Sequence, residues 1–362
     1  NSCPKISNHK RKFHCEIIWG SKGSGKNHFI WKQSELWRKQ SLVLDCDFAQ
    51  VNLAEEFNGN PADVFMRACE SLYNAYYEYM PQTFQPWEGA GNSLSSILDY
   101  VVDELAKKQY PTTVIFRNLE YASGKKRELL PSKERFSIRK ALRMAMGNIT
   151  KQEKDLHELL EYLSNNRELI PCRVVLATSD IQLLPAHWWS EMDNHDSISR
   201  LHFWKQHPFT KEEVKALLPI QAHKISLYGD FIKQSILLEQ VWEYTQGHPE
   251  SVYAVVDQLH SKSVEESIDK HQHKCYKYFL QVVENFVILW YDATALNHIL
   301  AELCENNFRL LNTPIGTPRS KEVEYLVACD ILFQNVDCLE VPVVPMQKAI
   351  SHFMKTGQKQ EA

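Results

Sequence analysis

The chain has 362 residues, of which 44% are hydrophobic and 24% charged, and this composition excludes a globally disordered protein. Its 41 Lys and Arg against 45 Asp and Glu give a net charge of -4, which excludes bulk attraction to polyanions and leaves only a local basic surface open. No run approaches the roughly 18 consecutive apolar residues that a membrane-spanning helix needs.

The nine cysteines are scattered from Cys3 to Cys338 and include no CxxC pair, which excludes a zinc ribbon and argues against a disulfide framework. We therefore expect reduced thiols and an intracellular location, cytoplasmic or nuclear. Because the chain begins at Asn1 and shows no apolar signal segment, we expect it to be a piece of a longer protein.

Short apolar runs alternate with amphipathic stretches in the first part of the chain. The runs, which predict buried parallel strands, cover residues 13–19, 41–44, 112–116, 173–177 and 201–204. Helical periodicity marks residues 29–39, 61–79, 93–108 and 151–165. Strands that alternate with helices predict an open α/β sheet with crossovers on both faces.

Beyond Pro208 the pattern becomes helical. Thr210-Lys211-Glu212-Glu213 is a capping-box start, and further helices are expected over residues 231–245 and 250–259. From about residue 270 we expect two or three helices, then a helix at 323–332 and a short β-ribbon at 338–344.

Residues 20–27 read Gly-Ser-Lys-Gly-Ser-Gly-Lys-Asn, which fits GxxxxGK between the first strand and the first helix. Glycine lets backbone N–H groups wrap closely around phosphate oxygens, and the following helix points its N-terminus at the anion. Lys26 is expected to reach the β- and γ-phosphates. The strand–helix context argues against a chance glycine loop. We expect ATP or ADP to contact Gly20, Ser21, Lys22, Gly23, Ser24, Gly25, Lys26, Asn27 and His28.

Asn27 stands where this pattern has Ser or Thr, whose hydroxyl is a magnesium ligand. The longer amide side chain offers a poorer and differently placed oxygen. The sequence therefore predicts phosphate binding with impaired magnesium coordination, and we assign no metal ligands.

This order of elements resembles the AAA+ ATPases of the STAND, archaeal-ATPase and origin-recognition kinds. The resemblance implies a P-loop parallel-sheet core followed by a helical lid and a winged-helix-like domain. The expected divisions are a basic arm at 1–12, the core at 13–207, the lid at 208–265 and the winged-helix-like domain at 266–362.

In this family the third core strand ends in an acidic Walker B pair, whereas the present sequence reads Arg117-Asn118-Leu119-Glu120. Arg117 replaces the magnesium-holding Asp, or Asn118 does if the register slips by one position. The positive charge of Arg117 would repel a divalent metal. The resemblance gives Glu120 the role of orienting a water molecule, and an ordinary surface glutamate is the alternative.

The resemblance assigns three further positions, each with a plainer alternative. Ser179 takes the sensor-1 position near the γ-phosphate, or belongs to a strand-end turn with helix-capping residues. Arg200 corresponds to an arginine presented to a neighbour's nucleotide, or is a surface residue. Gly247-His248-Pro249 resembles a GxP turn that brings Pro249 near the adenine and ribose, although a helix stop followed by a helix start explains the same residues.

Residues 123–143 hold eight cations against Glu128 and Glu134, a net charge of about +6. This charge indicates a surface that binds nucleic acid or an acidic partner. The alternative is a loop and helix face exposed to solvent. The helix at 320–329 carries Lys321 together with Glu322 and Glu324, which favours a structural or protein-binding role for the last domain. The candidate nucleic-acid residues are Lys125, Lys126, Arg127, Arg135, Arg139, Lys140 and Arg143.

Three functions are therefore open. The chain is a nucleotide-stabilised scaffold or slow switch with weak or no hydrolysis, an active ATPase, or a DNA- or RNA-associated origin-recognition-like ATPase. Asn27 and Arg117 both remove magnesium ligands, so they favour the first function and leave enzymatic activity undecided. Other protein subunits are the expected partners, and nucleic acid is the further candidate.

Overall fold

The computed structural model describes residues 14–49, 61–75, 93–107, 110–122, 151–165, 172–189, 192, 201–222, 231–260, 262–290 and 293–357. Internal contacts divide the chain into two compact units. The first holds Asn1–Gly20, Lys26–Glu128 and Arg143–Lys205, and the second holds Ser21–Gly25, Leu129–Leu142 and Gln206–Ala362. The phosphate loop predicted from the sequence thus contributes its five middle residues to the second unit.

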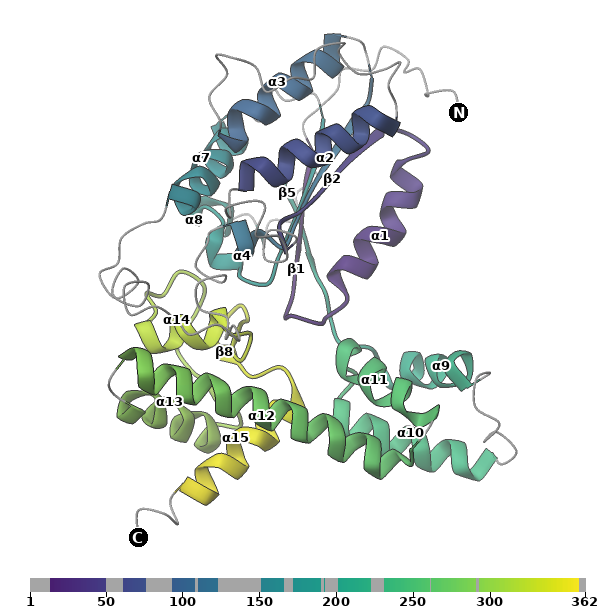
Figure 1. Ribbon diagram of the computed structural model, residues 1–362, viewed down its shortest axis with the longest axis vertical. Coiled ribbons are helices and arrows are strands. Elements are labelled where there is room, and N and C mark those ends of the chain that lie inside the picture. The colour runs from purple at the N-terminus through teal and green to yellow at the C-terminus, as the bar shows by residue number, and fades with distance from the viewer. Residues whose placement is uncertain are drawn as a thin grey trace. The chain divides into compact units, whose positions relative to one another are not determined.

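A parallel five-stranded sheet forms the centre of the first unit (Figure 1). The middle strands are buried along almost their whole length, whereas burial alternates along the edge strand β2. All five predicted strands are confirmed. In the spatial order β2-β3-β4-β1-β5 they are β2 (Leu42–Asp47), β3 (Thr112–Arg117), β4 (Arg173–Thr178), β1 (His14–Trp19) and β5 (Leu201–Lys205).

Helices cover both faces of this sheet (Figure 1). On one face α1 packs Ile30 and Trp37 into an apolar cluster with the strands. On the other face the ring of Phe116 of β3 stacks on the ring of Phe48, with 5.8 Å between their centroids. It is tilted against the ring of Phe65, with 5.2 Å between their centroids. The four predicted helices are confirmed as α1 (Lys26–Trp37), α2 (Pro61–Ala75), α3 (Leu94–Lys107) and α7 (Lys151–Asn165).

Three helices of the second unit surround one buried apolar cluster. These helices are α9 (Lys211–Ala222), α10 (Phe231–Thr245) and α11 (Pro249–Val256). The predicted capping box is present, because Glu213 N donates to Thr210 Oγ1 at 3.2 Å and Thr210 N donates to Glu213 Oε2 at 2.7 Å. Gly247 joins α10 to α11 with a φ of +74°, and a Cβ there would collide with the Phe209 carbonyl, so this turn requires glycine.

The rest of the second unit is a winged helix. Its antiparallel strands follow the order β6 (Arg309–Leu310), β8 (Leu339–Glu340), β7 (Phe333–Gln334). Tyr325 anchors its core, donating from its buried hydroxyl to the Val282 carbonyl at 2.9 Å. The helices are α12 (Val264–Trp290), α13 (Ala293–Glu305), α14 (Lys321–Ala328) and α15 (Val344–Gly357).

Several expectations for this region need correction. The helix expected from about residue 270 begins at Val264, so α12 runs across the proposed boundary between residues 265 and 266. The helix expected at 323–332 is α14, which ends earlier because Asp330 turns the chain with a φ of +60°. The ribbon at 338–344 is strand only at Leu339–Glu340, and residue 344 already begins α15.

Two absences concern the described residues only. None of the eight cysteines that the structure describes is joined in a disulfide. Across the same ranges, no helix combines the length and apolar character that crossing a membrane requires.

Truncation of Ile30 tests how strongly α1 is held on the sheet. Ile30 is 1% exposed, so Ile30→Ala should cost about 2–5 kcal/mol of unfolding free energy through lost burial and a cavity. Ile236 on α10 is 54% exposed, and Ile236→Ala is the matched control with a change under about 0.5 kcal/mol. Urea unfolding measures both, and equal losses would contradict this packing.

Candidate functional site

The turn between β1 and α1 has the backbone shape that close approach to an anion requires. Gly23 has a φ of +76° and Gly25 a φ of +91°, conformations that residues with a Cβ rarely adopt. Ser24 N donates to Ser21 O at 3.2 Å and closes a four-residue turn. Helix α1 starts directly after Gly25, so its unpaired N-terminal amides lie at the end of the loop.

Two polar side chains are enclosed in this loop. Lys26 is 6% exposed, and its Nζ donates to the Gly20 carbonyl at 2.7 Å. Ser24 is 5% exposed, and its buried Oγ meets no hydrogen-bond partner among the described residues. A buried ammonium, an unsatisfied hydroxyl and glycine backbone together fit a phosphate group. Asn27 and His28 are instead exposed on the first turn of α1.

Arg117 at the end of β3 is paired with the end of the neighbouring strand β2. Its Nε donates to Asp45 Oδ1 at 2.7 Å, and its Nη1 lies 3.5 Å from Asp47 Oδ2. Asn118, with a φ of +58°, donates from Nδ2 to Asp47 Oδ1 at 2.7 Å. The two carboxylates best placed to attract a cation are therefore already bonded. This pairing was not predicted from the sequence, although the two aspartates at the end of β2 were a signal for it.

Glu120 is buried, at 7% exposed, and does not lie on the surface. Its Oε1 accepts from Ser179 Oγ at 2.7 Å, while Oε2 accepts from Ser179 N at 3.1 Å and Thr178 Oγ1 at 3.2 Å. The structure thus brings together two residues that the sequence analysis proposed separately. Asp180 also caps the short helix η3 (Ile181–Leu183), since its Oδ1 accepts from Gln182 N at 3.2 Å.

The start of α11 contacts the loop residues that belong to the second unit. Glu250 N donates to Gly23 O at 3.1 Å, and His248 Nε2 lies 2.9 Å from Lys22 O. A Cβ built on Gly25 would lie 4.0 Å from Cγ of Pro249, so the predicted residue Pro249 lies beside the loop. The sequence analysis singled out Pro249 and missed the roles of His248 and Glu250.

The remaining predicted site residues lie outside the described residues. These are Arg200 and the basic set Lys125, Lys126, Arg127, Arg135, Arg139, Lys140 and Arg143. In the described part of the chain, no group of three or more His, Cys, Asp or Glu side chains is arranged to hold a metal ion.

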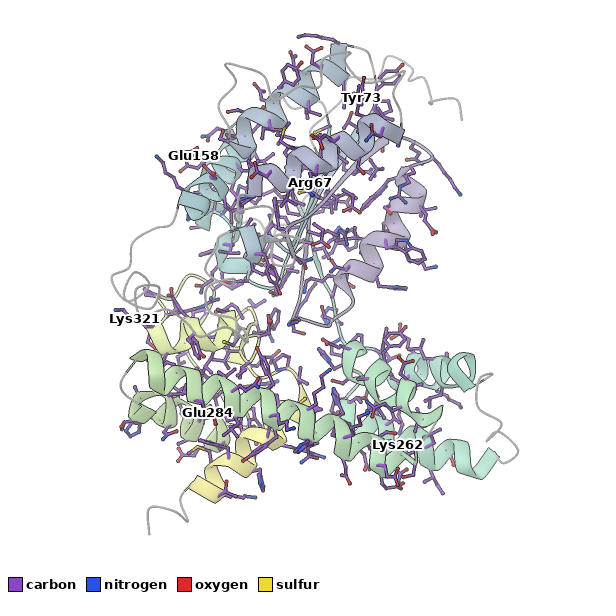
Figure 2. The ribbon with its side chains drawn as sticks, viewed as in Figure 1. Arg67, Tyr73, Glu158, Lys262, Glu284 and Lys321 are labelled. Carbon is purple, nitrogen blue, oxygen red and sulfur yellow. The ribbon has the colours of Figure 1, made fainter. Side chains whose placement is uncertain are left out.

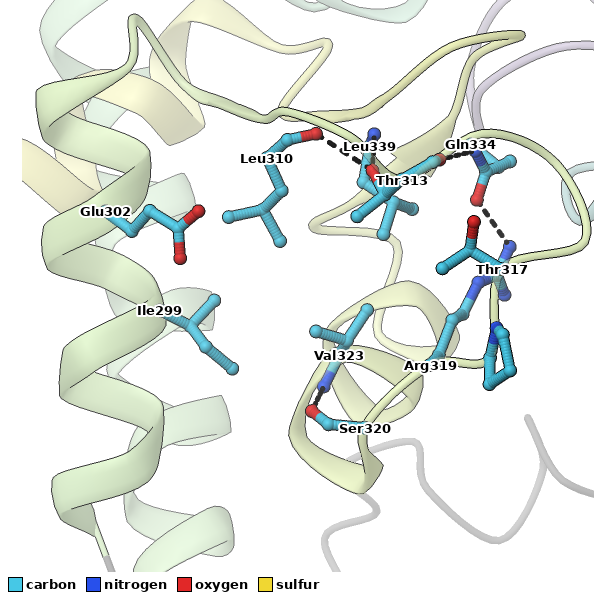
Figure 3. A pocket seen from close by; sticks show the side chains of 11 residues that line it. Ile299, Glu302, Leu310, Thr313, Thr317, Arg319, Ser320, Val323, Gln334 and Leu339 are labelled. Carbon is cyan, nitrogen blue, oxygen red and sulfur yellow. Dashed lines mark hydrogen bonds between the residues drawn. The ribbon is translucent and has the colours of Figure 1, made fainter.

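A separate cavity of about 220 Å³ lies in the winged helix, between α13, α14 and the short strands (Figure 3). Its polar wall is bonded to itself, because Gln334 Nε2 donates to Thr313 O at 2.8 Å and Arg319 Nη2 donates to Gln334 Oε1 at 3.3 Å. Ile299 and Leu310 line the apolar side. This volume is below the roughly 300–1,000 Å³ of ligand pockets, and the self-bonded wall fits a role in holding the wing.

Removal of the Arg117 charge tests the pairing at the ends of β2 and β3. Arg117→Met should cost about 1–3 kcal/mol of unfolding free energy, because two partly buried carboxylates lose their partner. The control is Lys154→Met, whose 3.7 Å pair with Glu158 is exposed and should contribute under about 0.5 kcal/mol. Urea denaturation of both variants decides, and a negligible Arg117 effect would refute the pairing.

Comparisons with known proteins add one finding at the level of fold. No protein-family model and no curated protein matches the chain. The Walker-type ATPase PABY2304 of Pyrococcus abyssi superposes with a TM-score of 0.57 at 13% identity, over 93% of this chain and 91% of that one. The Aeropyrum pernix ORC2 protein in its ADPNP–ADP complexes gives a TM-score of 0.41 at 12% identity, over 96% and 89%. At the level of fold, the chain is therefore similar to the Walker-type ATPase of Pyrococcus abyssi, and in this chain the fold comprises a parallel-sheet core and a winged helix.

Proposed function

We propose that the chain is an ATP- or ADP-binding module of the AAA+/STAND-like kind. It acts as a nucleotide-stabilised scaffold or slow switch within a larger assembly of protein subunits, with weak or no hydrolysis. A ligand that binds the folded conformation stabilises it by mass action, so nucleotide would hold this state without being consumed.

The observation that carries this proposal is the enclosed loop after β1. Lys26 is buried at the loop with its ammonium on the Gly20 carbonyl, and Ser24 keeps an unsatisfied buried hydroxyl. A bound phosphate would give that hydroxyl an acceptor and would balance the ammonium charge. Lys26 and Ser24 are therefore the residues we expect to bear most of the phosphate contact, together with the loop amides.

The weak-hydrolysis part of the proposal rests on the magnesium ligands. Asn27 offers an amide in place of a hydroxyl, and Arg117 places a guanidinium on Asp45 and Asp47. A divalent cation at this edge of the sheet would have to displace that guanidinium or lie beside it, and both are unfavourable. These residues therefore fit magnesium poorly.

An active ATPase is the second candidate, and Glu120 favours it. Its carboxylate is buried at the end of β4 beside Ser179, where a group that orients water would be expected. The hydrogen bonds that Thr178 and Ser179 donate to Glu120 also give its burial a purely structural explanation. Turnover therefore has to be measured.

Nucleic-acid binding receives no comparable support from the described residues. Helix α14 starts with Lys321, visible in Figure 2, but its first turn also carries Glu322 and Glu324. A helix that reads DNA is expected to be more basic than this. The basic segment 123–143 therefore remains a prediction that salt-dependent oligonucleotide binding would test.

Nucleotide binding is tested by replacing the loop lysine. Lys26→Ala should weaken ATP and ADP binding at least tenfold, because it removes the ammonium from the phosphate site. Calorimetric titration measures the affinity, and Lys39→Ala, an exposed lysine just after α1, is the control that should leave it unchanged. Chromatography of nucleotide released by denaturing the purified protein gives a second readout. Equal affinities for the two variants and wild type would overturn the proposal.

Hydrolysis is tested at Glu120. Glu120→Gln keeps the side-chain shape, and its amide can still bond Ser179, so the variant should fold normally while it loses the carboxylate charge. We expect phosphate release by wild type to stay near background and to be the same in Glu120→Gln. Release at least ten times faster in wild type would establish the active-ATPase alternative instead.

A further inference from the structure

Three contacts within the second unit converge on Lys22 and Gly23 of the loop. His248 and Glu250, at the start of α11, bond the two carbonyl oxygens at 2.9 and 3.1 Å. Asp330, in the turn after α14, places its Oδ2 3.1 Å from Lys22 Nζ. The main chain of this dipeptide is thus held by the helical lid and its one charged side chain by the winged helix.

The hydrogen-bond partners of His248 give each nitrogen of its imidazole a role. A carbonyl oxygen can only accept, so Nε2 must carry the proton that it donates to Lys22 O. Nδ1 then accepts from Ser251, whose N and Oγ lie 3.4 and 3.1 Å away. His248 is 3% exposed and is also the N-cap of α11. Its ring is therefore a fixed donor aimed at one peptide of the loop.

That peptide is the part of the turn that can face either way. The bond from Ser24 N to Ser21 O, with a positive φ at Gly23, is the pattern of a type II turn. Type I and type II turns differ in the orientation of the central peptide, here Lys22–Gly23. In a trans peptide the C=O and N–H groups point in opposite directions. The bond to His248 therefore turns the Gly23 N–H away from α11.

The close fit of α11 explains why residue 23 is glycine. A Cβ at Gly23 would lie 2.7 Å from Cε1 of His248 and would also collide with the Glu250 carboxylate. A larger residue would displace the imidazole from the Lys22 carbonyl. The contact with His248 and the positive φ therefore both require glycine at position 23.

The carboxylate of Asp330 is more buried than its partner. The Asp330 side chain is 9% exposed, whereas the Lys22 side chain is 50% exposed. Such a pair adds little to global stability. Its consequence is positional, because it keeps the Lys22 side chain directed toward the winged helix.

We propose that His248 and Asp330 are positioning residues that hold the loop in its phosphate-binding form. His248 sets the orientation of the Lys22–Gly23 peptide, which presents the Gly23 N–H to phosphate, and Asp330 couples the same residue to the winged helix. By thermodynamic linkage, bound nucleotide in turn strengthens the contacts that the two domains make with the loop. This inference rests on the proposed nucleotide binding and adds its regulation by the C-terminal domain.

The His248 arm of the test measures ADP affinity by calorimetric titration. His248→Ala should weaken binding about fivefold or more, whereas His248→Gln, whose amide nitrogen can take the place of Nε2, should stay within about twofold of wild type. Amide hydrogen exchange of residues 20–25 without nucleotide is an independent readout, and His248→Ala should accelerate it. Unchanged affinity and unchanged exchange in a folded His248→Ala protein would overturn the proposal.

The Asp330 arm separates positioning from simple charge. Removing a negative charge near an anion site should strengthen ADP binding if only Coulomb attraction matters. We expect Asp330→Asn to weaken it by about threefold, and the Lys22→Met/Asp330→Asn double variant to be no weaker than Lys22→Met alone. Asp337→Asn, an exposed aspartate on the wing, is the matched control and should have no effect. Tighter binding in Asp330→Asn would overturn this arm.

Failure of the proposed nucleotide binding and failure of the positioning role would give different results. If wild type does not bind ADP, the proposed function fails, and loop hydrogen exchange alone then judges whether His248 holds the peptide. If wild type binds ADP and Lys26→Ala abolishes binding, but His248→Ala and Asp330→Asn behave as wild type, nucleotide binding stands and the positioning proposal is wrong.

Discussion

The positive φ of Gly23 is the constraint on which the rest of the site depends. It closes the turn from Ser21 to Ser24 and lets the following amides begin helix α1 around Lys26. The same glycine leaves the space in which α11 approaches, so His248 can reach the Lys22 carbonyl. One backbone conformation thus serves both the proposed phosphate binding and the contact with α11, and a side chain at this position would disturb both.

The charged side chains at the ends of β2 and β3 bear on metal binding and not on the proposed nucleotide binding. In many nucleotide-hydrolysing sites a carboxylate at the end of a strand holds magnesium against the phosphates. Here Arg117 occupies that strand end and is bonded to Asp45 on the neighbouring strand. Binding by backbone amides and Lys26 needs none of these groups. This arrangement is the basis of the proposal that the phosphate loop works without a metal.

The sequence predicted the elements whose signals are local. Five short apolar runs became the five strands, and the Thr210 capping box formed as expected, because burial and capping depend on nearby residues. Helix α15 was not predicted, and its Pro345 lies in the first turn, where proline is tolerated. The contacts Arg117–Asp45, His248–Lys22 and Asp330–Lys22 were missed because they join residues 72, 226 and 308 positions apart, and only strand register and domain packing bring these together.

The most direct test of the central claim compares the affinity of wild type for ADP in excess magnesium and in excess EDTA, by calorimetric titration. The account predicts dissociation constants within about threefold of each other, because Lys26 and the loop amides bind the phosphates while Asn27 and Arg117 offer magnesium no site. A tenfold or greater tightening by magnesium would contradict it and would show that a metal site forms in spite of these two residues.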